Sequence, residues 1–185
     1  MADDVVDLIM QDHREVERLF DELQTAPEKR TNLVPVLTTL LFAHSRAEEA
    51  SVYPAAAAEA GVADDVAHSQ DEHVEADQLL ADLAGTDPDS AAFDKVLQDL
   101  IDAVSHHVEE EESKVLPGMR TGLSAERLAE LGTAFAASRK EHLGDQPEDM
   151  TRDHLLPQAR NTDLSGASSL GKDELKKKLQ QEADG

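Results

Sequence analysis

The first 117 residues contain one pattern twice, and this internal repeat constrains the fold more than any other feature of the sequence. Residues 12–23 (DHREVERLFDEL) align with residues 72–83 (EHVEADQLLADL), and residues 44–54 (HSRAEEASVYP) align with residues 107–117 (HVEEEESKVLP). Each copy carries a histidine on one segment and His-x-x-x-Glu on the next, with a proline six residues beyond the glutamate. We therefore expect two equivalent hairpins related by a pseudo-twofold axis.

Four segments place apolar residues at three- and four-residue steps, which is the spacing of amphipathic helices. The expected helices cover residues 4–25, 31–53, 65–84 and 90–116. Short connections between them predict an all-α fold, an up-down-up-down four-helix bundle. Ser124 fits the N-cap position of a fifth, less hydrophobic helix over residues 125–142. No run alternates with the period of a β-strand.

The sequence divides into two parts. Residues 1–143 are expected to form the helical bundle and its fifth helix as one domain. Residues 144–185 are polar and broken by prolines, which predicts a mobile tail with one possible short helix in KDELKKKLQQ.

The chain is strongly acidic, with a formal net charge of −23. Such a charge repels nucleic acid and anionic membranes, so neither is expected as a partner. The absence of cysteine excludes disulfides, thiolate ligands and a thiol nucleophile. No apolar stretch has the length of a membrane span, and the N-terminus lacks the basic start of a signal peptide. We expect a cytoplasmic protein, as a monomer or weak dimer.

Two His-x-x-x-Glu motifs, His44 with Glu48 and His107 with Glu111, each place an imidazole and a carboxylate one helical turn apart on one face. That face is the apolar one, because each motif continues a stripe of leucine and valine. An unpaired carboxylate in an aliphatic core costs several kcal/mol. Two core-facing glutamates beside two histidines therefore indicate a shared cation.

His13 and His73 lie on the core stripes of the other two helices and add two imidazoles. Six donors in two matching sets suit two metal ions bridged by carboxylates better than one tetrahedral zinc, which takes about four ligands. Mixed histidine and carboxylate ligands favour iron or manganese. The expected metal ligands are His13, His44, Glu48, His73, His107 and Glu111.

These residues resemble the hemerythrin-like family, the His-His-Glu cation-binding domains, over residues 1 to about 117. Both motifs, both lone histidines and the prolines after the motifs match. The resemblance implies a four-helix bundle holding two iron ions with an oxo or hydroxo bridge, and it favours iron over manganese or zinc. It also implies that Glu48 and Glu111 bridge the metals.

The chain departs from the oxygen-carrying members of that family at one position. Those members have a second histidine one turn after the third-helix histidine, where this chain has Asp77, and the equivalent position in the first half is Glu17. The resemblance therefore argues against five-histidine oxygen carriage. Fewer histidines imply open coordination positions for peroxide or nitric oxide, and members of this type are associated with catalase-like and nitric-oxide-related activities.

Asp77, Glu17 and Tyr53 are weaker candidates for metal binding or for a contact with a ligand. We expect Asp77 to hold a histidine ring or bind weakly and to assist proton movement in catalysis, and Glu17 to be solvated. Tyr53 lies five residues after Glu48, and ideal α-helical geometry turns it away. Packing at the bundle end is therefore expected for Tyr53, with a phenol reaching an open metal site as the alternative.

The remaining ionisable residues around the motifs are not expected to bind metal. His68 lies near the start of its helix, and His106 shares a face with acidic residues. The residues expected to face solvent are His106, Glu109, Glu110 and Glu112.

Together these features predict a non-haem di-iron protein that reacts with a small oxidant, with hydrogen peroxide disproportionation as the favoured reaction. In this interpretation the metal pair acts as Lewis acid and electron sink. The alternatives are reversible binding or sensing of dioxygen or nitric oxide without turnover, and iron storage or buffering.

Overall fold

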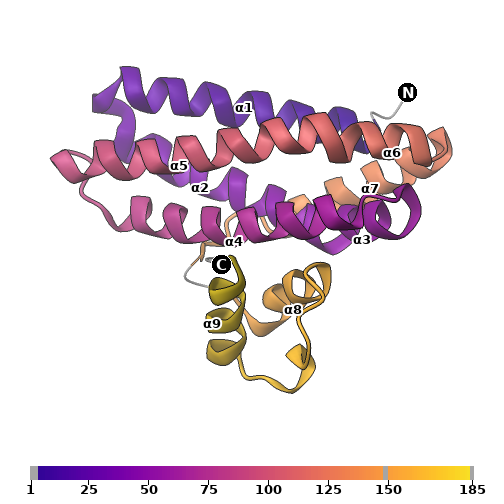
Figure 1. Cartoon of the computed structure of the whole chain (residues 1–185). Coiled ribbons are helices and arrows are strands. Elements are labelled where there is room, and N and C mark those ends of the chain that lie inside the picture. The colour runs from indigo at the N-terminus through magenta and orange to yellow at the C-terminus, as the bar shows by residue number, and fades with distance from the viewer. Residues whose placement is uncertain (1–3, 148–149, 184–185) are drawn as a thin grey trace.

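The computed structural model describes residues 4–147 and 150–183, and within these ranges every regular element is helical (Figure 1). This confirms the all-α prediction. Figure 1 shows four long helices lying alongside one another. Their bounds are α1 Val5–Thr25, α2 Arg30–Ala47, α4 Ala63–Gly85 and α5 Ala91–Glu110. A short 3₁₀ turn, Pro27–Lys29, joins α1 to α2.

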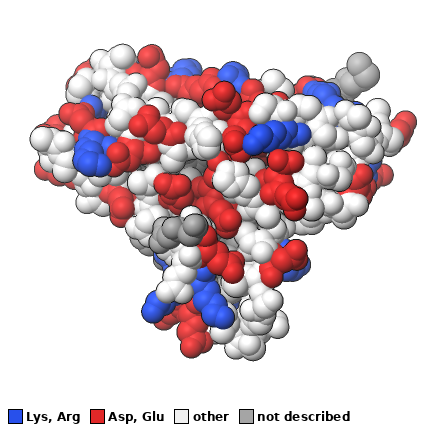
Figure 2. All heavy atoms as spheres, in the orientation of Figure 1, with Lys and Arg blue, Asp and Glu red and all other residues white. Residues whose placement is uncertain are grey.

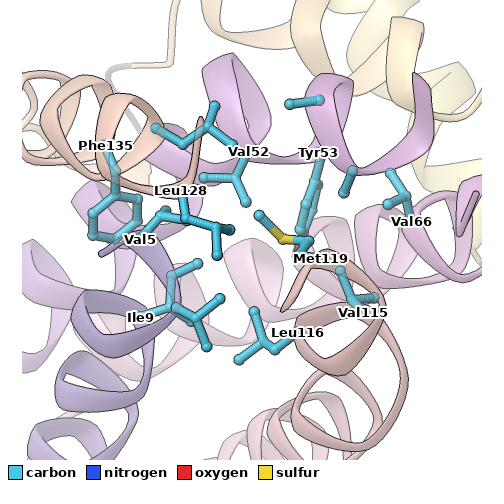
Figure 3. Packing of buried hydrophobic residues seen from close by; sticks show 14 of the residues in the cluster. Val5, Ile9, Val52, Tyr53, Val66, Val115, Leu116, Met119, Leu128 and Phe135 are labelled. Carbon is cyan, nitrogen blue, oxygen red and sulfur yellow. The ribbon is translucent and has the colours of Figure 1, made fainter. Parts of the chain in front are cut away.

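Two apolar clusters fill the bundle, one toward each end. The first joins the stripes of the four long helices and includes Leu19, Leu23, Leu37, Leu80, Leu83, Phe93, Leu97 and Leu100. Figure 3 shows the second, which gathers around Tyr53 and includes Val5, Ile9, Val52, Val66, Val115, Leu116, Met119, Leu128 and Phe135. The histidine and glutamate side chains described below belong to neither cluster, so apolar packing closes the site on both sides.

The second and fourth long helices continue through the prolines that were expected to end them. After α2 the chain makes a π-helical turn, Glu48–Val52, and runs on through α3 Tyr53–Ala55 and a second π-helical turn, Ala56–Ala60. After α5 it makes the π-helical turn Glu111–Val115 and continues as α6 Leu116–Gly122.

Two of these π-helical turns, Glu48–Val52 and Glu111–Val115, start at the glutamate of a His-x-x-x-Glu motif and end two residues before a proline. The backbone N–H of Tyr53 donates to the Glu48 carbonyl, and that of Leu116 donates to the Glu111 carbonyl, five residues back. Proline has no N–H and crowds the preceding turn of an α-helix. A wider turn before Pro54 and Pro117 relieves that conflict, because π-bulges carry i to i+5 bonds within a continuing helix.

A fifth helix, α7 Ala125–Glu141, packs against α1 and α2. Ser124 is its N-cap, since its side chain accepts a hydrogen bond from the Arg127 backbone N–H. Phe135 on the buried face of α7 packs with its ring edge toward His44, at 5.7 Å between ring centroids. The fifth helix therefore forms part of the wall of the site.

The C-terminal segment differs from the mobile tail that the sequence indicated. It forms two helices, α8 Arg152–Asn161 and α9 Lys172–Ala183, which lie against the outside of α4 (Figure 1). A third apolar cluster joins them to the bundle and consists of Phe42, Val74, Met150, Leu155, Ala159, Ala167, Leu175 and Leu179. The expected short helix is present as α9. Residues 148–149 and 184–185 of the expected tail lie outside the described residues.

Candidate metal centre

The six residues expected to bind metal meet in the middle of the bundle, between the two apolar clusters. All are buried, with exposed fractions between 0 and 7%. They come from the four long helices and are His13 in α1, His44 in α2, Glu48 just after α2, His73 in α4, His107 in α5 and Glu111 just after α5.

Each glutamate lies between two histidines from different helices. The Oε2 atom of Glu48 is 3.2 Å from His44 Nε2 and 3.4 Å from His73 Nε2. The Oε2 atom of Glu111 is 3.3 Å from His13 Nε2 and 4.0 Å from His107 Nε2. All four histidines thus present the same ring nitrogen to the centre.

The donors form two groups with metal-ligand spacing. His13, His44 and Glu48 form one group, and Glu48, His73 and His107 form the other, with ligand atoms inside each group within 4.8 Å of one another. Glu48 belongs to both groups. Glu111 contacts His13 of one group and His107 of the other. Both glutamates therefore connect the two groups of donors.

The buried donors need a positive charge that the protein does not supply in full. Neither oxygen of Glu48 or Glu111 makes a hydrogen bond within the described structure, nor do the Nε2 atoms of His13 and His44. Unpaired carboxylates in a core are strongly unfavourable. The donor set of nitrogen and oxygen therefore fits metal cations, since such ions would satisfy all of these atoms at once.

The pKa shifts report the same imbalance. Burial lowers the pKa of His44, but the carboxylates of Glu48 and Asp12 outweigh burial and raise this pKa to about 10. For His73, burial again opposes the shift, while Glu48 and Glu49 raise the pKa to about 9. Burial raises the pKa of Glu48, yet His44 and His73 bring it well below its ordinary value. The histidines thus serve as the counter-cations of the glutamates when metal is absent.

A second ring of carboxylates holds the outer nitrogen of each histidine. His44 Nδ1 lies 3.2 Å from Asp12 Oδ2, and His107 Nδ1 lies 2.9 Å from Glu72 Oε2. In the same way, Glu49 Oε1 lies 3.2 Å from His73 Nδ1.

The fourth pair completes this ring, since Glu112 Oε1 lies 2.9 Å from His13 Nδ1. A carboxylate that accepts from Nδ1–H fixes the ring orientation and leaves Nε2 free to bind metal. Each of the four histidines is thus positioned by an acidic residue from a different helix.

Arginines neutralise three of these four carboxylates. Arg46 Nη2 donates to Glu49 at 2.8 Å, and its guanidinium is almost fully buried over the Phe42 ring. Arg139 of α7 pairs with Asp12, and Arg14 pairs with Glu112. Arginine suits these positions because its guanidinium stays charged when buried and donates several hydrogen bonds in one plane.

The four outer carboxylates were missed as site residues by sequence reasoning, and Glu112 had been expected to face solvent. The repeat contains a signal for them. An acidic residue precedes each lone histidine, Asp12 and Glu72, and another follows each core glutamate, Glu49 and Glu112. Acidic residues at the same two positions of both halves are difficult to explain as surface residues alone.

Tyr53 lies inside the site rather than merely packing at the end of the bundle. It is fully buried, its ring stacks on His73 at 5.2 Å, and its hydroxyl lies 3.1 Å from His73 Nε2. Burial and the carboxylates of Glu111 and Glu48 raise its pKa well above the ordinary value, so the phenol stays protonated. The expectation from ideal α-helix geometry was wrong because the π-helical turn changes the rotation between Glu48 and Tyr53.

Asp77 and Glu17 do not touch the six central residues. Asp77 Oδ2 accepts from Arg46 Nη2 at 2.9 Å and from Gln158 Nε2 at 3.2 Å, so it supports a histidine only through Arg46 and Glu49. Glu17 is half exposed and pairs with Arg14 on the surface, in agreement with its expected solvation.

A cavity of about 20 Å³ adjoins the histidines. That is enough volume for one water-sized molecule. Apart from the histidines, its walls are mainly apolar and are formed by Val16, Leu41, Ser45, Ala76, Val104 and Val108.

The helices and the core site define a helical-bundle protein with a buried cation site built from nitrogen and oxygen ligands. The family described as hemerythrin HHE cation binding domain matches residues 4–118, and the chain belongs to this family. The family resemblance seen in the sequence is therefore confirmed.

One relative of the chain is a protein named DNA nickase from Nostoc sp. (strain PCC 7120 / SAG 25.82 / UTEX 2576). The two are 32% identical over 147 residues, which cover 77% of this chain. The chain spans 42% of the length of that protein. No solved structure matches the chain. No helix in the described ranges has the length and apolar content that a membrane crossing requires.

Proposed function

We propose that this chain is a non-haem di-iron protein with the up-down-up-down topology of a four-helix bundle. The observation that carries the proposal is the position of Glu48 and Glu111, each between histidines of the two ligand groups. Both glutamates would bridge the two metals. The six ligands are His13, His44, Glu48, His73, His107 and Glu111.

We further propose that the site disproportionates hydrogen peroxide, converting two molecules of peroxide to two of water and one of dioxygen. Bound iron supplies a Lewis acid and a reversible electron sink for this reaction. The small cavity beside the histidines favours a substrate close to water in size, and its mainly apolar walls disfavour larger polar molecules.

The protein's own groups position and protonate the substrate. The protonated phenol of Tyr53 lies at the His73 side of the centre, where it can donate a hydrogen bond to an oxygen atom. Asp77 acts as a positioning residue, because its carboxylate reaches His73 only through Arg46 and Glu49.

The test is oxygen release from peroxide by the iron-loaded chain, with bound iron counted per chain. We expect about two iron ions and sustained oxygen evolution. Glu111→Ala should lose the iron absorption spectrum and the turnover together. Two irons without oxygen evolution would favour reversible dioxygen or nitric oxide binding, and many irons per chain would favour storage.

The relative's name, DNA nickase, does not extend to this chain in our proposal. The aligned region is under half of that protein. Acidic side chains also outnumber basic ones on the face shown in Figure 2, and the formal net charge is −23. Such a surface repels a phosphate backbone.

A further inference from the structure

Glu72 is the one outer carboxylate of the metal centre that no arginine or lysine contacts within the described ranges. Its Oε2 atom lies 2.9 Å from His107 Nδ1. Its side chain is 10% exposed, and its buried Oε1 atom makes no hydrogen bond to any described residue. The matching residue in the first half of the repeat, Asp12, has Arg139 as its cation. A positive charge is therefore missing at Glu72.

Two exposed histidines and a second glutamate surround this unpartnered oxygen. His68 Nε2 lies 3.5 Å from Glu72 Oε1 and 3.4 Å from Glu110 Oε2. His106 Nε2 lies 3.7 Å from Glu72 Oε1. All four residues offer ligand atoms within 4.8 Å of one another.

The four residues form two further His-x-x-x-Glu pairs, His68 with Glu72 on α4 and His106 with Glu110 on α5. Glu72, His106 and Glu110 each come one position before a core residue, and His68 lies one helical turn before Glu72. In the first half, α7 covers the corresponding faces of α1 and α2, whereas on α4 and α5 both histidines are more than half exposed.

We propose that His68, Glu72, His106 and Glu110 form a second metal site, at the surface, for a first-row divalent cation such as zinc. Ligand atoms about 2.0–2.1 Å from zinc lie about 3.3–3.4 Å apart at tetrahedral angles. The measured separations of 3.4, 3.5 and 3.7 Å are close to this. Lys114 pairs with the other oxygen of Glu110, Oε1, and leaves Oε2 facing His68.

Glu72 connects this surface site to the buried centre. A cation on Oε1 withdraws electron density from the carboxylate whose Oε2 accepts from His107, and so weakens the hold on that ring. Carboxylates that hold a metal-bound histidine typically change metal affinity about 10- to 100-fold when altered. A cation at the surface site is thus expected to change the affinity of the buried site for iron and the absorption bands of the bound iron. This coupling, unlike the surface site itself, rests on the proposed di-iron function.

The site is tested with the full chain saturated with iron and then titrated with zinc by calorimetry. We expect His68→Ala with His106→Ala to bind one zinc fewer, or at least about tenfold more weakly, than wild type. The matched control is His142→Ala with His154→Ala, which removes two imidazoles from another cluster, formed with Asp145. The control variant should bind zinc at the His68/His106 site as wild type does.

Iron content is measured in every sample, so a failure of the buried site is seen separately from a failure of the surface site. Crystals soaked in zinc should show zinc-edge anomalous density among the four side chains. No such density, or equal zinc binding by wild type and the His68/His106 variant, would overturn the site. Unchanged iron absorption bands in wild type with zinc bound would overturn the coupling.

Discussion

At the scale of single residues, one step along a helix separates a core ligand from a surface residue. The side chain of His107 is 9% exposed and that of His106 is 62% exposed. Neighbouring helical positions differ by about 100° in direction, so the two rings face opposite environments.

His107→Ala is therefore expected to lower bound iron strongly, while His106→Ala leaves it near the wild-type value. The first change removes a ligand nitrogen from the buried group, and the second removes a nitrogen only from the surface cluster around Glu72. Iron per chain, measured on both purified variants, is the readout. Equal losses in the two variants would show that the assignment of faces is wrong.

Arg46 is the most deeply buried of the three arginines that pair with outer carboxylates. Its buried guanidinium donates to both Glu49 and Asp77. Arg46→Ala is expected to cost about 3–5 kcal/mol of unfolding free energy, because it leaves buried carboxylates without a counter-charge.

The control for this change is Arg14→Ala. Arg14 is 52% exposed and also pairs with an outer carboxylate, Glu112. An exposed pair contributes only about 0–1 kcal/mol. Urea unfolding of both variants measures the difference, and similar losses would contradict the importance of burial.

Single-residue reasoning could find the six central residues because a glutamate or histidine on a leucine stripe is costly to bury unless a cation binds it. It could not find Asp12, Glu49, Glu72 and Glu112. An acidic residue at the edge of a stripe is solvated in most helices, and only the neighbouring helix decides whether it meets a histidine.

At the scale of elements, the π-helical turns explain the main local error. A proline after an amphipathic segment usually ends the helix, and the rotation from Glu48 to Tyr53 was judged by α-helical geometry. The hydrogen bond from the Tyr53 N–H to the Glu48 carbonyl, five residues back, changes both the end of the helix and the direction of the Tyr53 side chain. The helix continues, and Tyr53 lies against His73. Nothing in the spacing of apolar residues indicates such a turn.

Of the two C-terminal helices, the sequence indicated only the last, for a related reason. Their apolar residues are few, and each helix alone could bury little surface. Their burial comes from pairing with Phe42 and Val74 on the bundle, contacts between distant parts of the chain. A short polar helix can be stable when such a partner surface exists.

Removing residues 144–185 tests the contribution of this element. All six central residues remain, so the variant should still bind iron. Its melting temperature should fall, because Phe42 becomes exposed and Glu49 loses the hydrogen bond from Gln158. Thermal unfolding and iron content are measured together.

Gln158→Ala in the full chain separates the hydrogen bond from the apolar packing. It should cost about 1 kcal/mol, since Glu49 keeps Arg46, Gln70 and His73 as partners. A truncated chain as stable as the full chain would contradict the role given to α8 and α9.

At the scale of the whole molecule, the bundle concentrates acidic groups around a centre that needs cations. The net charge is −23 and acidic groups predominate on the face shown in Figure 2, so a metal ion approaching that face meets an attractive field. Within the centre, metal and proton compete for the same histidine nitrogens. Stability should consequently depend on pH more strongly in the metal-free chain than in the metal-loaded chain.

In the metal-free protein, His44 and His73 have folded-state pKa values of about 10 and about 9, above the ordinary value of 6.5. Protonated histidines therefore stabilise the fold fully below about pH 6.5, and this contribution is lost as the pH rises through 9 to 10. Glu48 has a lowered pKa, so its contribution is present above its ordinary 4.5 and is lost at lower pH. The metal-free chain is thus expected to be most stable between about pH 4.5 and 6.5.

The iron-loaded chain should behave differently, because metal replaces the protons on the Nε2 atoms. Its urea midpoint is expected to stay level from pH 7 to about pH 9, whereas that of the metal-free chain declines over the same interval. Chelator-treated and iron-loaded samples, unfolded in urea across this series, provide the comparison. A level midpoint in the metal-free samples would mean that protonated histidines do not balance the buried glutamates. A parallel decline in both would mean that the metals are not held by these nitrogens.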